Sequence, residues 1–78
     1  MSIHIQNAVY ASPNKGVDCT NAVITLVDGG KTTITVLPED LGIPDPDFGV
    51  RKGFTVTYVI NGEPKFKGGI DGDKITLD

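Results

Sequence analysis

The chain has 78 residues, which is enough for one domain with a thin core and too few for two. Its formal charge of −3 and its seven scattered Lys and Arg residues provide no basic surface for nucleic acid. No apolar run approaches the roughly 18 residues of a membrane span, so we expect none.

Cys19 is the only cysteine, which excludes an internal disulfide and a zinc site built from several cysteines. With no secretory signal pattern at the N-terminus, this cysteine usage favours a cytoplasmic location. We expect Cys19 to be a small buried apolar residue rather than a reactive thiol, because no histidine or basic residue adjoins it.

The opening segment predicts a β-strand whose apolar residues change phase. Ile3 and Ile5 share one face, whereas Ala8 and Tyr10 are shifted by one position. A β-bulge near Asn7 would bring both pairs onto the same face.

Segment 20–27 fits two structures. Its apolar residues follow a helical stripe that Thr20 could cap, but its β-branched residues and the turn at 28–30 also fit a hairpin with 31–37. We favour a short helical turn at 20–27 and predict a strand over 31–37 in either case.

The clearest local pattern is a hairpin in the second half of the chain. Apolar residues alternate over 54–60, Asn61-Gly62 supplies a tight turn, and 63–70 reads as the returning strand. A short last strand follows at 74–77.

Five or six short strands in a chain of this length predict a mostly β fold, a compact Ig-like sandwich or a partial barrel formed by one domain over 1–78. We expect Val, Ile and Leu to form most of the core. The aromatic residues expected to complete it are Tyr10, Phe48, Phe54, Tyr58 and Phe66.

Segment 38–49 is rich in Pro, Asp and Gly and predicts an ordered surface loop, pinned by Leu41, Ile43 and Phe48. Its end, Asp47-Phe48-Gly49, matches the magnesium-positioning tripeptide of protein kinases. That match is chance, because the chain is several-fold too short and has no other kinase motif.

Acidic residues suggest a calcium site as an alternative. Asp45 and Asp47 lie in the long loop, and Asp71 and Asp73 flank Gly72. Calcium needs six to eight oxygen ligands, but no EF-hand pattern is present and such acids commonly serve as turn formers. Calcium is therefore a secondary hypothesis, and no other cofactor is expected.

Nothing in the sequence indicates catalysis. His4 is the only histidine and lies opposite Ile3 and Ile5 on the first strand, where we expect it to be exposed. A nucleophile would need a base and an orienting carboxylate, and no motif places them together. We therefore expect that the protein is not an enzyme.

The order of landmarks resembles a known family. Ile3-x-Ile5-x-x-Ala8-x-Tyr10 comes first, and Asp18-Cys19-Thr20, Leu41-Gly42, Asp45-Pro46, Gly49-Val50-Arg51-Lys52, Phe54-x-Val56-x-Tyr58 and Ile75-x-Leu77 follow in that order. This order is similar to that of the small β-rich domain of unknown function at the C-terminus of a mitochondrial DnaJ-like protein, found also beside lectin or glycosidase domains in bacterial and fungal proteins. The usual pattern has Val at Cys19 and Gly at Ala11. The resemblance implies an accessory module and supplies no catalytic or ligand residues.

The function expected from the sequence is a non-enzymatic accessory module that binds a protein or glycan through loops such as 38–49. Candidate ligand-binding residues are Tyr10, Asp45, Asp47, Phe48 and Tyr58, the three aromatic rings as stacking surfaces. The main alternative is a structural module that oligomerises by pairing the edge of 31–37 with a second copy.

Overall fold

The computed structural model describes residues 3–78, which form six strands and two short helices. In chain order these are β1 (Ile3–Ala11), β2 (Gly16–Asp18), α1 (Thr20–Asp28), β3 (Thr33–Thr35), α2 (Pro38–Leu41), β4 (Gly53–Ile60), β5 (Glu63–Ile70) and β6 (Lys74–Thr76). Within this range no helix is long and apolar enough to cross a membrane.

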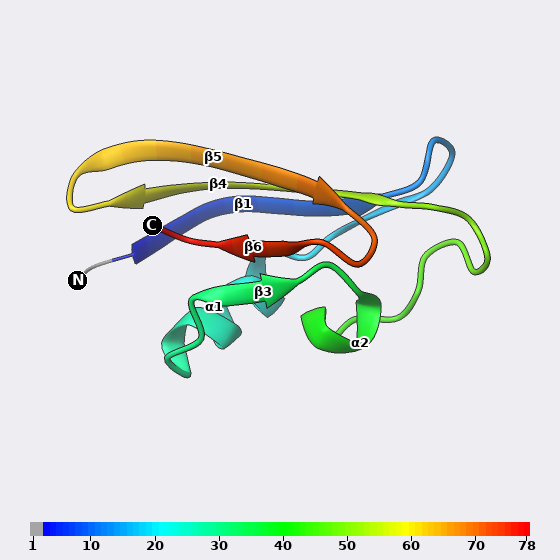
Figure 1. Cartoon of the computed structure of the whole chain (residues 1–78), viewed down its shortest axis with the longest axis horizontal. Helices are drawn as coiled ribbons and strands as arrows, with labels where there is room; N and C mark the ends of the chain where they lie inside the picture. Colours follow the sequence, from blue (N-terminus) through cyan, green and yellow to red (C-terminus); the bar gives the residue numbers. More distant parts are fainter. Residues whose placement is uncertain (1–2) are drawn as a thin grey trace.

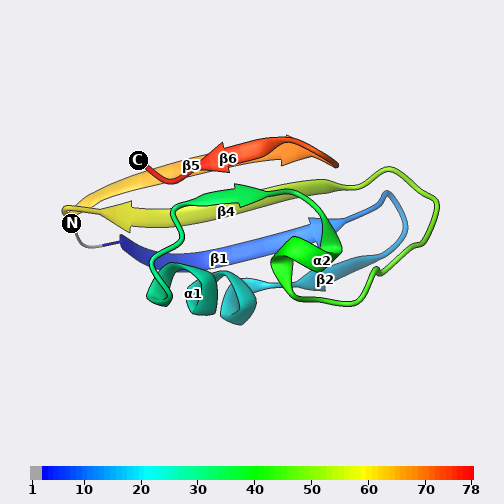
Figure 2. The ribbon, with the colours of Figure 1, turned by 60° about the horizontal axis from the view of Figure 1, so that its bottom comes forward.

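The strands form two antiparallel sheets in two layers (Figure 1). The larger sheet has the order β2-β1-β4-β5, and β3 pairs with β6 in a smaller one. Figure 2 shows the smaller sheet and both helices lying across one face of the larger sheet. The mostly β fold is confirmed, and the two layers are sandwich-like rather than a closed barrel.

The predicted hairpin is confirmed. β4 pairs with β5 from Ile60↔Glu63 to Gly53↔Ile70, and the turn residues Asn61 and Gly62 have φ angles of 52° and 83°. Both positive angles are those of a two-residue type I′ turn, for which Asn-Gly is the preferred sequence.

The predicted bulge and helix are also confirmed. The register between β1 and β4 shifts between Ile5 and Asn7, which returns Ala8 to the buried face. At 20–27 the helical alternative is correct, but Thr20 is not its cap. Instead the Asp18 carboxylate accepts the Thr20 N–H at 2.9 Å, and the Thr20 hydroxyl accepts the Ala8 N–H at 2.9 Å, which ties the helix start to β1.

The core lies between the two layers. The larger sheet contributes Ile5, Ala8, Tyr10, Phe54, Val56, Tyr58 and Ile60, and the covering layer contributes Cys19, Val23, Ile34, Val36, Leu41, Ile75 and Leu77. Two aromatic residues expected in the core are not there. Phe48 is 91% exposed and Phe66 is 66% exposed, the first at a loop tip and the second on the outer face of β5.

The elements differ from the sequence prediction in several places, and the last strand, expected over 74–77, ends at Thr76. The strand expected over 31–37 is only the three residues of β3, and at its far end Leu37 is already the N-cap of α2. α2 itself lies inside the segment predicted as loop, where Pro38 stands at its first position and Gly42, with φ of 73°, ends it. The three-residue β2 was not predicted.

Candidate functional site

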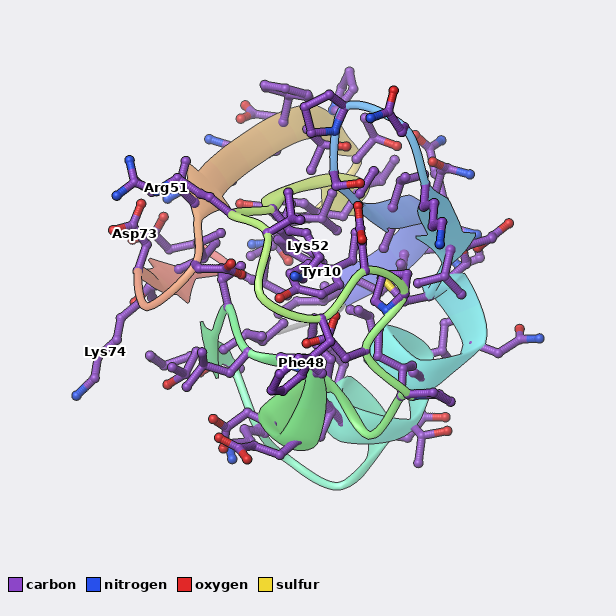
Figure 3. The ribbon with its side chains drawn as sticks, turned by 90° about the vertical axis from the view of Figure 1, so that its right-hand side faces the viewer. Tyr10, Phe48, Arg51, Lys52, Asp73 and Lys74 are labelled. Carbon is purple, nitrogen blue, oxygen red and sulfur yellow. The ribbon has the colours of Figure 1, made fainter. Side chains whose placement is uncertain are left out.

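One end of the molecule carries a cluster of polar side chains beneath the loop 42–52. Figure 3 looks onto this end and shows Tyr10 and Lys52 at the centre, enclosed by the loop. We call Tyr10, Asp45, Lys52 and Asp71 the loop clasp. These residues come from β1, from the loop and from the turn between β5 and β6.

Lys52 is the centre of the clasp and is only 3% exposed. Its ammonium donates hydrogen bonds to the carbonyls of Asp47, at 2.7 Å, and of Val50, and it pairs with the Asp45 carboxylate at 3.1 Å. The three donors of the ammonium therefore each have an acceptor within the loop. A buried lysine is stable only under this condition, so the loop and Lys52 depend on each other.

The two carbonyls that Lys52 holds bracket a tight turn. The Val50 N–H donates to the Asp47 carbonyl at 3.2 Å, and Gly49 at the third position has φ of 81°, as a type II turn requires. Phe48 occupies the second position, and its ring points away from the protein. The loop tip thus presents one aromatic ring on a fixed backbone.

Asp71 ties the clasp to the sheet. It accepts a hydrogen bond from the Tyr10 hydroxyl at 2.5 Å, and its other oxygen accepts the Lys52 backbone N–H at 2.9 Å. The Lys52 ammonium also lies 5.9 Å from the centre of the Tyr10 ring, a cation–π distance. Burial, and then the hydrogen bond and negative charge of Asp71, raise the pKa of Tyr10 well above its ordinary value.

Asp45 stays ionised for local reasons. Its carboxylate accepts the Asp47 N–H at 3.0 Å, and this hydrogen bond, followed by the contact with Lys52, lowers the pKa of Asp45. Protonation of Asp45 in acid removes the charge that faces Lys52. The ion pair therefore stabilises the folded state fully above the ordinary pKa of an aspartate, and this stabilisation is lost as the pH falls through the lowered pKa of Asp45.

A shallow groove of about 280 Å³ runs beside the clasp. It is lined by Tyr10, Leu37, Pro38, Asp45, Gly49, Val50, Arg51, Lys52 and Asp71. Every buried side-chain N or O atom in residues 3–78 has a hydrogen-bond partner. The acids and the amine of the groove are thus already engaged with one another, an arrangement that fixes a conformation rather than one poised to transfer a proton.

The structure brings three of the candidate aspartates to this end with separate tasks. Asp45 and Asp71 belong to the clasp, and Asp47 accepts a hydrogen bond from the Ser12 hydroxyl at 2.7 Å. Asp73 instead closes the last turn by accepting the Ile70 N–H at 3.0 Å. Among the described residues, no three His, Cys, Asp or Glu side chains are grouped to hold a metal ion. The calcium hypothesis gains no support from this geometry and stays a prediction.

The two tyrosines do not offer the stacking surfaces suggested by the sequence. Tyr10 and Tyr58 are both completely buried, and the Tyr58 hydroxyl donates to the Asp78 carbonyl at 3.2 Å, apart from the loop clasp. Of the three aromatic candidates, Phe48 alone exposes its ring.

Lys52 is the important residue that the sequence analysis missed, although a signal was present. Positions 52, 54, 56, 58 and 60 are in phase on the buried face of β4 and its approach. A lysine in phase with four core residues must be buried and neutralised by its surroundings, and the acidic loop just before it supplies the partners.

Cys19 is expected to be chemically inert in the folded protein. It is 1% exposed, and burial together with the nearby charge of Asp18 raises the pKa of its thiol to about 11. At pH 8 the folded protein should therefore react with a disulfide reagent such as DTNB far more slowly than the unfolded protein in urea. Equal rates in the two states would contradict the buried placement.

Comparison with family models, with curated proteins and with solved structures found no match for this chain. The resemblance to the domain of the DnaJ-like protein accordingly remains a prediction from the sequence.

Proposed function

We propose that this domain is a non-enzymatic accessory module that binds a protein or glycan partner through the loop 42–52. The observation that carries the proposal is the 91% exposure of Phe48 on a turn whose two flanking carbonyls are held by a buried lysine. A large apolar ring gains nothing from water, so a rigid turn that displays it fits a contact residue.

Rigidity supports this proposal independently of exposure. Binding by a mobile loop costs the conformational entropy of ordering it, and a loop already fixed in the free protein avoids that cost. The clasp holds the backbone on both sides of Phe48, and a shallow groove lies beside it. An exposed ring on a fixed turn beside a groove suits contact with a sugar ring or an amphipathic protein segment.

Amide NMR titrations would test the glycan version with defined oligosaccharides of glucose, N-acetylglucosamine and mannose, and with calcium chloride as a separate arm. A supporting result is a set of shifts confined to residues 45–52 that Phe48→Ser abolishes. Because Phe48 contacts the core little, this variant should keep the unfolding free energy within about 0.5 kcal/mol of the parent. Shifts confined to Asp45, Asp47, Asp71 and Asp73 with calcium alone would favour the metal hypothesis instead.

The protein version is tested by affinity capture with three baits, the parent, Phe48→Ser and Phe66→Ser. Both variants remove one exposed phenylalanine, but only Phe48 belongs to the loop. A protein that is retained by the parent and by Phe66→Ser and lost with Phe48→Ser supports the proposal. If Phe48→Ser changes neither glycan shifts nor captured proteins, the loop is not the binding surface.

A further inference from the structure

The outer face of the larger sheet, opposite the core, is uncovered. The positions that point to this side are His4, Asn7, Val9 and Ala11 on β1, Gly53, Thr55, Thr57 and Val59 on β4, and Pro64, Phe66, Gly68 and Ile70 on β5. We call these twelve positions the open face. In Figure 1 it is the upper side of the molecule, and neither helix nor the smaller sheet covers it.

The open face has an unusual composition for a solvent-facing sheet surface. None of its twelve positions is Asp, Glu, Lys or Arg, although 22% of the chain is charged. The nearest charge on the same side is Asp18 of the edge strand β2, which pairs with Val9. On β5 the usual placement of polar and apolar residues is exchanged. Lys65 and Lys67 lie on the side of the core. Phe66 and Ile70 lie on the open face, where they are 66% and 46% exposed. Exposed sheet faces normally carry the charged residues.

The face is also large enough for a stable contact. The three strands of the open face, with eight or nine residues each, span roughly 26 Å by 14 Å, and side-chain relief raises the accessible area to roughly 500–600 Å². Two such faces together bury roughly 1,000–1,200 Å², which reaches the lower end of the range for specific interfaces. An uncharged patch of this size on a small domain is typical of an interaction surface.

The shape of the face matches a second copy of itself. The β1 and β5 rows flank β4, and at each level of the sheet the larger side chain lies on one of these two rows and the smaller on the other. A two-fold axis along β4 places the β5 row of each copy over the β1 row of the other at the same level. Register then joins a larger side chain to a smaller one at every level: Ile70 with Ala11, Val9 with Gly68, Phe66 with Asn7, and His4 with Pro64.

The charge of the open face does not oppose this occupant. Each copy has a formal charge of −3, which repels a second copy over most of the surface, but the open face adds no charge to that repulsion. Such a face cannot select an acidic or basic partner by steering, and its selectivity must come from shape.

We propose that the domain forms a homodimer in which two open faces pack against each other as a sandwich, with Thr57 near the two-fold axis. This contact is distinct from the loop that carries Phe48. It is also distinct from the edge of β3, which pairs with β6 on one side and is only three residues long.

Sedimentation equilibrium of the whole chain from micromolar to millimolar concentration tests the proposal, with two matched variants. Thr57→Lys places an ammonium on the open face opposite its own copy and should raise the dimer dissociation constant at least about 100-fold. Thr33→Lys makes the same change on exposed β3 and should leave the dimer intact. Loss of the dimer with Thr33→Lys and not with Thr57→Lys would identify the β3 edge instead, and a parent that stays monomeric throughout would overturn the proposal.

The register is tested by mixing two charge variants. Ile70→Lys and Ala11→Glu should each weaken self-association, whereas an equimolar mixture should form a heterodimer in which the new charges face each other. Native mass spectrometry distinguishes the three dimers by mass. A mixture that associates no better than either variant alone would rule out the axis along β4. Circular dichroism of each variant establishes that the fold is retained, so a lost dimer is not mistaken for unfolding.

Discussion

Replacing Lys52 by methionine should lower the free energy of unfolding by about 3 kcal/mol, because it leaves two carbonyls and a carboxylate of the loop without their donor. Methionine keeps most of the volume of the lysine stem, so the loss reports the ammonium and not a cavity. A domain of this length has a total stability of about 4–12 kcal/mol, of which this loss is a large fraction. Urea unfolding followed by circular dichroism measures it.

The matched control is Lys74→Met, which removes an exposed lysine on β6 and should change stability by less than about 0.5 kcal/mol. A second readout separates the clasp from general destabilisation. In Lys52→Met, amide exchange should increase most at 45–52, before the hairpin of β4 and β5 is affected. Equal stability of the two variants, or unchanged exchange in the loop, would show that Lys52 does not hold the turn that carries Phe48.

The clasp shows what the sequence can and cannot predict at this site. The sequence predicted the surface loop and its acidic residues, but it placed Phe48 in the core and grouped Asp45, Asp47, Asp71 and Asp73 as possible ligands of one metal ion. The structure instead gives each a protein donor: Lys52, Ser12, Tyr10 and Ile70. Which donor meets which acid depends on how the turn after β5 approaches the loop, and this contact between distant segments leaves no local pattern.

The strands were predictable where short-range rules decide them. The Asn61-Gly62 turn fixes the register of the hairpin, and the change of phase around Asn7 requires a bulge. Alternation, however, identifies two faces without saying which is buried. On β5 alternation places Phe66 and Lys65 on opposite faces, but hydrophobicity assigns Phe66 to the wrong one, because the lysines lie on the inner side and the phenylalanine on the outer side.

Removing the Asp71 carboxylate should be about as costly as removing the Lys52 ammonium. Asp71→Ala leaves the Tyr10 hydroxyl and the Lys52 backbone N–H without acceptors, and two such donors in a largely buried site cost about 3 kcal/mol together. Tyr10→Phe removes one of those donors, while Asp71 retains its bond to the backbone and its access to water, so that change should cost only about 1 kcal/mol.

A double-mutant cycle shows whether the hydroxyl and the carboxylate act as a pair. In the background of Tyr10→Phe, Asp71→Ala no longer leaves a buried hydroxyl without an acceptor, so the double variant should be more stable than the sum of the single losses predicts. Urea unfolding of the four proteins at pH 7 gives the coupling free energy. Strictly additive losses would mean that the short Tyr10–Asp71 contact contributes nothing specific.

Alkaline pH gives the same pair a second, independent test. Because the pKa of Tyr10 is raised in the folded protein, the unfolded chain loses its phenolic proton first as the pH passes about 10. The contribution of Tyr10 to the free energy of unfolding is thus complete below pH 10. Above pH 10 this contribution declines by about 1.4 kcal/mol per pH unit until the tyrosine of the folded protein ionises. Tyr10→Phe should remove this decline, so the stability difference between parent and variant should shrink and then reverse above pH 10. A difference that stays constant from pH 8 to pH 11 would show that the hydroxyl is not held by Asp71 in the folded protein, since only a buried and hydrogen-bonded phenol resists ionisation in this way.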